Sequence, residues 1–231
     1  MKNKILNHKS VKWIAHRGLP SQSVENTEEG FLLASELPFY GIETDVHLTY
    51  DDIFVLHHDD NIKHLTQIDL LIEKSTYQNL LNYPLKNTQH KIPLLETYLR
   101  ICKSKGKKAV IELKFPMTHQ KFKKLYALIE AYDYIEHTIF ISFIIDNLLH
   151  VRGINSTIEI QFLTDQFDEV ILQMLKKYHM NLSIHFSKVN QEMVQIVHNH
   201  HLKIGVWTVN DIDIAEKMIE LGVDYITTDG F

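Results

Sequence analysis

The sequence predicts an α/β fold, a single (β/α)8 barrel of the TIM type that spans residues 1–231. Three observations support this fold class. Short apolar runs alternate with longer amphipathic stretches along the whole chain. The runs are continuously apolar, as in parallel strands that are covered on both faces. No break in composition, repeat or linker marks a domain boundary, and 231 residues suit one such barrel.

Eight apolar runs are expected to form the strands of the barrel. They are residues 11–15, 40–46, 108–113, 138–143, 158–163, 181–185, 203–209 and 225–229. Helices are expected between them, at residues 25–35, 93–105, 121–132, 146–151, 168–178, 190–200 and 211–221. Several of these stretches begin at an Asp or Asn that can cap a helix, and Pro93 suits a first turn. Gly106 and Gly222 lie where helices commonly end.

The chain departs from the regular alternation after the second strand. The segment VHLTYDDIFVLHHD, residues 46–59, contains a second strand-like run that follows too closely for a parallel crossover. We therefore expect a hairpin that turns near Asp51–Asp52 and brings His57 and His58 back to the rim of the barrel. The segment that follows is too long for a plain loop. It predicts a small helical insert at about residues 60–91, which we expect to cap the mouth.

The other departure is at the end of the chain. Residues 230–231 directly follow the eighth strand, so the closing helix of a full barrel is missing. We expect the N-terminal segment, or a second subunit of a homodimer, to cover the strand surface that this helix would protect.

Composition narrows the functional classes. The formal net charge of −5 argues against a nucleic-acid-binding protein, which usually carries a basic excess. No apolar run approaches the ~18 residues of a membrane span, and the N-terminus lacks the apolar region of a signal peptide. Cys102 is the single cysteine, so no intramolecular disulfide can form. We therefore expect a cytoplasmic protein without stable membrane insertion.

Three carboxylates are expected at the mouth of the barrel, where the carboxyl ends of the strands carry the chemistry of this fold. Glu43 and Asp45 are two residues apart on one strand and so share a face, as do Glu112 and Lys114 on the next. Three carboxylates in one mouth repel one another unless a cation lies between them. Oxygen ligands favour Mg²⁺ or Ca²⁺ over Zn²⁺. The alternative is that Lys114, Arg17 and backbone groups pair with them.

Two histidines could complete such a site. His16 ends the first strand and His58 ends the returning hairpin, and two imidazoles can serve as general base and general acid in phosphodiester cleavage. Arg17 and Lys114 would neutralise the phosphate. His57 must face away, because adjacent strand residues point to opposite sides.

Other polar and aromatic residues are less informative. Trp207 ends its strand and suits either the core or a platform for an alcohol group, including a choline cation. Ser142 has no base nearby in the sequence and is not expected to be a nucleophile. The aspartates of the hairpin are expected to be solvated turn residues; they are Asp51, Asp52, Asp59 and Asp60.

Sequence motifs in order along the chain resemble the glycerophosphodiester phosphodiesterase family. They are AHRG at 15–18, ENT at 25–27, GIETDVHLTYDDIFVLHHD at 41–59, IPLLETYL at 92–99, IELK at 111–114, ISF at 141–143, VWTVN at 206–210 and GVDYITTD at 222–229. The combination covers essentially the full chain. Val24 replaces a proline that is usual before the ENT motif, and no departure removes a site position.

The resemblance implies a TIM-type barrel that uses one divalent cation to hydrolyse small glycerophosphodiesters to sn-glycerol 3-phosphate and an alcohol. Glycerophosphocholine and glycerophosphoethanolamine are examples of such substrates. The implied roles are metal ligation by Glu43, Asp45 and Glu112, acid–base catalysis by His16 and His58, phosphate binding by Arg17 and Lys114, and a pocket wall from Trp207. His58 is preferred to His57 because it directly precedes an aspartate.

Two other functions stay open at this point. One is a lipid phosphodiesterase, similar to phospholipases of related fold, that releases a cyclic phosphate. The other is a barrel that binds a phosphodiester without cleaving it, which would not need both histidines.

Overall fold

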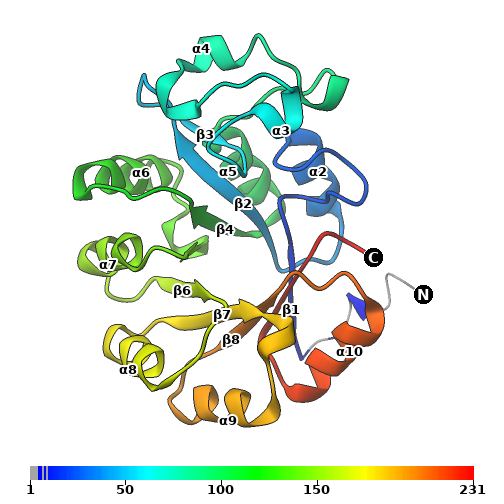
Figure 1. Cartoon of the computed structure of the whole chain (residues 1–231), viewed down its shortest axis with the longest axis vertical. Coiled ribbons are helices and arrows are strands. Elements are labelled where there is room, and N and C mark those ends of the chain that lie inside the picture. The colour runs from blue at the N-terminus through cyan, green and yellow to red at the C-terminus, as the bar shows by residue number, and fades with distance from the viewer. Residues whose placement is uncertain (1–4, 7, 9) are drawn as a thin grey trace.

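Eight parallel strands form a closed barrel, which confirms the predicted fold class (Figure 1). The computed structural model describes residues 5, 6, 8 and 10–231. Strand β1 pairs with β2 on one side and with β9 on the other, and this closes the sheet. The order around the barrel is β1 (Lys12–Ala15), β2 (Gly41–Leu48), β4 (Lys108–Leu113), β5 (Thr138–Ser142), β6 (Glu159–Thr164), β7 (Asn181–His185), β8 (Ile204–Trp207) and β9 (Tyr225–Thr228).

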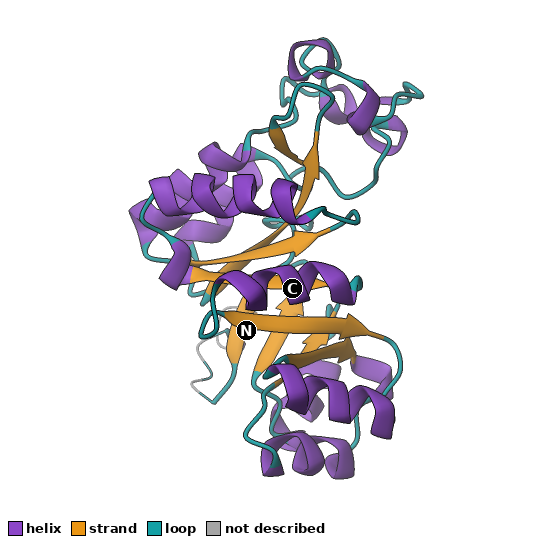
Figure 2. Ribbon diagram, turned by 90° about the vertical axis from the view of Figure 1, so that its left-hand side faces the viewer, coloured by secondary structure: helices purple, strands orange, loops and turns teal. Residues whose placement is uncertain are grey.

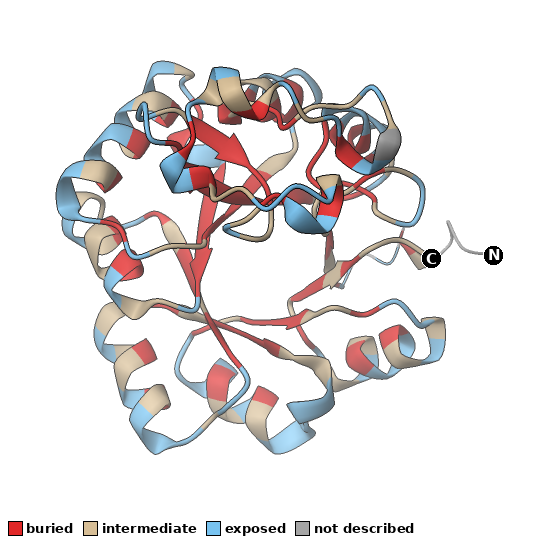
Figure 3. Cartoon of the chain, turned by 45° about the horizontal axis from the view of Figure 1, so that its top comes forward, coloured by how far each residue is buried: buried red, intermediate tan, exposed pale blue. Residues whose placement is uncertain are grey.

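The longer helices of the described chain lie outside the barrel and cover its apolar strands (Figure 3). They are α2 (Glu28–Glu36), α5 (Leu95–Lys105), α6 (His119–Ala131), α7 (Ile145–Ile154), α8 (Glu169–Tyr178), α9 (Gln191–Asn199) and α10 (Ile212–Leu221). Short 3₁₀ turns precede β5 and follow β7, namely η3 (Ile135–His137) and η4 (Phe186–Lys188). All seven expected helices are present, with shifted ends.

Local hydrogen bonds explain where the predicted helix ends were wrong. Helix α2 begins after Thr27, whose side chain accepts a hydrogen bond from the Gly30 N–H, so residues 25–26 stay outside the helix. Helix α5 begins two residues after Pro93, because Leu94 bridges to the hairpin and the Pro93 carbonyl accepts the Leu56 N–H. That extended pairing competes with the expected first turn.

The predicted hairpin is present. Strand β3 (Phe54–Leu56) runs antiparallel to β2, with Val46 opposite Leu56, and the turn contains Asp52 in a left-handed conformation. Beyond β3, the His57 N–H still donates to the Asp45 carbonyl at 3.1 Å. The returning chain is therefore held against β2 up to the rim, as the sequence predicts.

The insert after β3 forms a small subdomain at one end of the molecule (Figures 1 and 2). It contains α3 (Lys63–Thr66), η1 (Ile72–Lys74), α4 (Tyr77–Leu80) and η2 (Leu85–Asn87). Its own apolar cluster holds it together and includes Ile62, Leu65, Ile72, Leu80 and Val55 of β3. The insert is thus anchored to the hairpin by packing.

Both ends of the described chain add apolar side chains to the core. Residues 230–231 follow β9 without a further helix, and the Phe231 ring packs edge-on against Trp13 of β1 at 5.7 Å between centroids. Leu6 is buried in the same core cluster. Residues 1–4, 7 and 9 lie outside the described part, so the covering role of the N-terminal segment is supported only at Ile5 and Leu6. The homodimer stays a prediction.

Among the described residues, no helix has the length and apolar character needed to cross a bilayer.

A buried polar cluster closes the amino-terminal end of the barrel. One carboxylate oxygen of Glu159 accepts hydrogen bonds from the Tyr225 hydroxyl at 2.6 Å and the Asn181 amide at 3.0 Å, and the other lies 3.2 Å from Lys203 Nζ. Burial would raise the pKa of Glu159, but Tyr225 and Lys203 outweigh it and hold that pKa below its ordinary value.

Glu159→Gln should lower the free energy of unfolding at pH 7 by about 1 kcal/mol, because it removes the charge that pairs with the partly exposed Lys203 and weakens the hydrogen bond from Tyr225. The folded-state pKa of Glu159 is depressed, so its contribution is present above the unfolded pKa of about 4.5 and is lost as pH falls through the folded value. Urea unfolding at pH 7 and pH 4 should therefore show a difference between the two proteins that shrinks at the lower pH. A difference independent of pH would contradict this role.

Candidate active site

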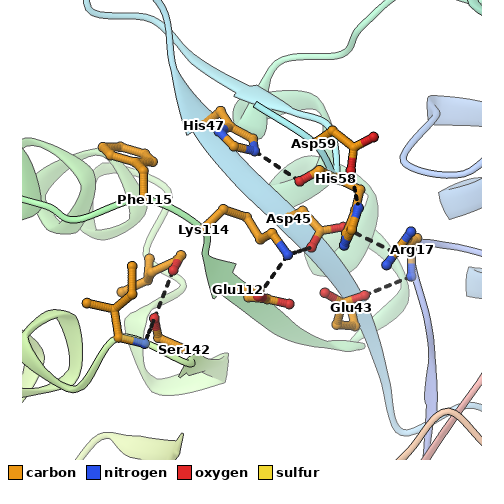
Figure 4. A network of polar contacts seen from close by, with 12 residues as sticks. Arg17, Glu43, Asp45, His47, His58, Asp59, Glu112, Lys114, Phe115 and Ser142 are labelled. Atoms are coloured by element: carbon orange, nitrogen blue, oxygen red, sulfur yellow. Dashed lines mark hydrogen bonds and ion pairs between the residues drawn. The ribbon is translucent and has the colours of Figure 1, made fainter. Parts of the chain in front are cut away.

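The site lies at the carboxyl ends of β1, β2, β4 and β9 and beside the hairpin. Figure 4 shows Arg17, the three carboxylates, His58 and Lys114 gathered there. Glu43 and Asp45 leave the same face of β2, and the β2–β4 register places Glu112 directly opposite Asp45. One carboxylate oxygen from each of the three residues lies within 4.8 Å of the others. The predicted three-carboxylate cluster is therefore present in the structure.

The three carboxylates are buried and perturb one another. Burial, then the nearby Asp45 and Glu112, raise the pKa of Glu43 well above its ordinary value. Burial and Asp45 raise the pKa of Glu112 to about 7. Burial opposes ionisation of Asp45 too, but Lys114 and Arg17 outweigh it and lower its pKa. The surroundings thus favour the charged form of Asp45 and disfavour it at Glu43 and Glu112, where further positive charge would stabilise it.

Two cations of the protein supply only part of that charge. Lys114 Nζ lies 3.0 Å from Glu112 and 3.6 Å from Asp45, and Arg17 Nε lies 3.4 Å from Asp45. Even so, Glu43 Oε1 and Asp45 Oδ1 are buried without a hydrogen-bond partner in the described chain. Carboxylate oxygens that lack a hydrogen bond within a buried three-carboxylate cluster suit a hard divalent cation. The residues therefore fit a hard divalent cation such as Mg²⁺ or Ca²⁺. The ion pairs with Lys114 and Arg17 that formed the alternative are present as well.

Arg17 is fixed by an unusual backbone at the end of β1. It adopts a left-handed conformation, and its N–H donates to Glu43 Oε2 at 2.8 Å while its guanidinium bonds Glu25 at 3.1 Å. Gly18 follows with φ 85°, and a Cβ there would lie 2.8 Å from the Gly30 backbone. Only glycine permits this approach of the loop to α2. The packing of α2 therefore fixes where Arg17 points.

His16 is oriented by a carboxylate from the opposite end of the sequence. Its Nδ1 lies 2.6 Å from Asp229 Oδ1, and because that carboxylate can only accept, the Nδ1–H donates. Asn210 holds the second Asp229 oxygen at 2.6 Å and accepts the Asp229 N–H. Nε2 of His16 is left toward the site, 4.0 Å from Glu43.

His58 has a similar arrangement on the hairpin. Its Nδ1–H donates to Asp59 Oδ1 at 2.7 Å, and burial, together with the positive charges of Arg17 and Lys114, lowers its pKa. The adjacent His57 is buried and donates from Nδ1 to the Asp59 carbonyl at 2.9 Å, so it serves the loop, as predicted. His58 is the one of the pair that lines the mouth.

Support for the site comes from residues just outside it. Asn26 of the ENT motif donates to Asp45 Oδ2 at 2.8 Å and accepts the Thr44 hydroxyl, while Thr27 caps α2. His47 donates from Nε2 to the His58 carbonyl at 3.1 Å and stacks on Phe115. These contacts hold Asp45 and the hairpin in place.

The mouth pocket, which we define as the cavity of about 260 Å³ among His16, Arg17, Glu43, Glu112 and Trp207, has two different walls. Opposite the charged residues lie Ile141, Leu163 and Trp207, whose indole packs edge-on against Phe143 and His185 at 5.6 and 5.4 Å. Trp207 thus lines the pocket as well as packing on the barrel interior. No described residue of the insert lines this pocket, so the expected cap lies beside the mouth instead.

Two supporting contacts were not predicted. Asp59 was expected in a solvated turn but hydrogen-bonds His58, and Asp229, which ends the eighth expected strand, had no expected partner but orients His16. Strand closure gives the signal that could have found the His16–Asp229 pair, because the first and last strands of a closed barrel are neighbours. The partner of His58 is signalled by the adjacent His–Asp pair itself.

Comparison with known proteins agrees with this geometry. Residues 16–231 match the profile of the "Glycerophosphoryl diester phosphodiesterase family". A glycerophosphodiester phosphodiesterase of Caldanaerobacter subterraneus subsp. tengcongensis is 28% identical, over 94% of this chain and 93% of that one. Among solved structures, a glycerophosphodiester phosphodiesterase of Parabacteroides distasonis has a TM-score of 0.82 and 29% identity, covering 95% of this chain and 93% of its own.

A second similar structure is an Oleispira antarctica phosphodiesterase in complex with the product sn-glycerol-3-phosphate. Its TM-score is 0.84 and its identity 25%, over 94% of this chain and 92% of that one.

Adding Mg²⁺ or Ca²⁺ should raise the melting temperature of the protein, because an ion bound to the folded state alone stabilises it. In Glu43→Gln this rise should be largely lost. The melting temperature of Glu43→Gln in EDTA should equal or exceed that of wild type, because burial and the nearby Asp45 and Glu112 already disfavour the charged form of Glu43. Differential scanning fluorimetry measures both effects. The control is Glu73→Gln on the exposed surface of the insert; an equal cation response in Glu43→Gln would contradict the assignment.

Proposed function

The chain belongs to the glycerophosphoryl diester phosphodiesterase family, a family of hydrolases, and we propose that it cleaves small glycerophosphodiesters with the aid of one divalent cation, Mg²⁺ or Ca²⁺. Glycerophosphocholine and glycerophosphoethanolamine are the proposed substrates, and sn-glycerol 3-phosphate and an alcohol are the products. The observation that carries the proposal is the pair of carboxylate-held histidines beside a three-carboxylate cluster in one pocket.

In this proposal the phosphate lies between the two cations of the protein. Arg17 and Lys114 both line the mouth pocket and both already balance the carboxylates, so they can share their positive charge with a bound diester. An ion held by Glu43, Asp45 and Glu112 would supply further charge neutralisation and polarise a phosphoryl oxygen.

The two histidines divide the proton transfers. One accepts a proton from the attacking water and the other donates a proton to the oxygen of the leaving alcohol. For both rings the Nδ1–H is held by a carboxylate, Asp229 for His16 and Asp59 for His58, which leaves Nε2 as the working atom. A cytoplasmic location remains a prediction from the sequence.

His16→Ala and His58→Ala should each lower kcat/KM for glycerophosphocholine by roughly 10²–10⁴-fold, the contribution typical of one general acid or base. A coupled assay of glycerol 3-phosphate release, with and without EDTA and added Mg²⁺ or Ca²⁺, gives the measurement. His198→Ala is the matched control, since His198 pairs with Asp224 outside the mouth pocket. Wild-type turnover in both site variants would refute the proposal. A cyclic phosphate in the phosphorus NMR spectrum would instead favour the phospholipase-like reaction.

Asp229→Asn should lower kcat by roughly ten- to a hundredfold, the loss usual when a partner that orients an active histidine is removed. The KM should change little, because Asp229 acts through His16 rather than on the phosphate. Asp224→Asn alters a histidine–aspartate pair of the same kind and should leave both constants unchanged. A fall in kcat that is equal in both variants would show a general loss of folding rather than of orientation.

A further inference from the structure

A second cavity adjoins the mouth pocket. We call it the insert cleft: a wider space of about 720 Å³ between the hairpin and the insert, with Asp60, Lys63, His64 and Asp69 on its walls. His58 and Lys114 line both cavities. The two spaces therefore meet beside one acid–base histidine and one of the cations proposed to bind phosphate.

The two cavities differ in chemistry. The mouth pocket has an apolar wall of Ile141, Leu163 and Trp207, with the hydroxyls of Ser183 and Thr227 beside it. Every residue that lines the insert cleft is polar or charged. A phosphodiester carries two alcohol groups on its phosphorus, which we call its arms. The two arms of a bound substrate would therefore meet two different environments.

The volumes and linings of the two cavities indicate which substituent of the diester each would hold. The mouth pocket must hold the phosphate as well as one arm, so its 260 Å³ leaves room for a short arm. Glycerol suits it, because its carbons can pack on Trp207 while its hydroxyls bond to Ser183 and Thr227. The cleft is larger and accepts an arm of variable length.

We propose that the insert cleft is the binding subsite for the leaving alcohol, and that it takes small polar alcohols such as choline or ethanolamine. This inference rests on the proposed function and extends it to the arrangement of the substrate. The charged and polar groups on every wall disfavour a fatty acyl chain there, because the chain would displace water from those groups without replacing their hydrogen bonds.

Asp60 is the best residue with which to test the subsite. Its backbone is fixed, since its carbonyl accepts the Ile72 N–H at 2.9 Å. In the described chain its carboxylate makes no hydrogen bond or ion pair. The neighbouring carboxylates are engaged, because Asp69 bonds Lys63 at 3.0 Å and Asp59 bonds His58. A change at Asp60 therefore alters the cleft without breaking an internal contact.

The experiment compares two substrates that share the glycerol arm: glycerophosphocholine and the methyl diester of sn-glycerol 3-phosphate. Asp60→Arg narrows the cleft and should lower the ratio of their kcat/KM values about tenfold, a change of about 1.4 kcal/mol, with methyl diester turnover retained. His64→Arg, which adds bulk and positive charge at a second position of the cleft, should act in the same direction. Glu73→Arg makes the same kind of change on the insert outside the cleft and should leave the ratio unchanged.

The outcomes distinguish a failure of the proposed subsite from a failure of the proposed function. An unchanged ratio in both cleft variants overturns the subsite, as does an equal loss for both substrates, which would place the glycerol in the cleft. Failure of the wild-type protein to cleave either diester would instead refute the proposed function. Melting temperatures close to wild type confirm that the variants are folded.

Discussion

Repulsion among three buried carboxylates is the constraint on which the rest of the site depends. Glu43, Asp45 and Glu112 are brought together by strand register, and neither β2 nor β4 can move one of them away without slipping the barrel. The surrounding residues compensate for that charge. Arg17 and Lys114 contribute positive charge, and Asn26 and the Arg17 N–H donate hydrogen bonds. The residues that balance the negative charge of the carboxylates in the free protein are thus well placed to bind an anionic substrate.

Strand periodicity explains why most of the site could be predicted. Glu43 and Asp45 share a face because they are two residues apart, and a closed parallel barrel brings the carboxyl end of every strand to one mouth. The hairpin followed from a spacing too short for a crossover, and it brought His58 to the correct rim. Regular strand and barrel geometry determines the fold class, the strand order and the positions of the predicted site residues. That geometry can be predicted from the pattern of apolar and polar residues in the sequence.

What could not be predicted depends on contacts between distant or irregular segments. The start of α5 was misplaced because Pro93 and Leu94 pair with β3, a tertiary contact that overrides the local preference of proline for a first turn. The insert lies beside the mouth because its apolar residues pack on Val55 of the hairpin. Asp59 was expected in a solvated turn: its position next to His58 signals a pair, but the rotamers that bring Nδ1 to Oδ1 depend on the folded loop.

The pairing of His16 with Asp229 links the assembly of the site to the order of synthesis. The two residues are 213 positions apart, and they meet only where β9 pairs with β1. A chain emerging from the ribosome therefore carries Arg17 and all three carboxylates long before His16 acquires its carboxylate partner. Since closure of the barrel is also the longest-range pairing of the fold and such contacts form slowly, the oriented histidine should be among the last features to appear. A partly made chain would then have the groups that attract a phosphate without the arrangement that orients His16.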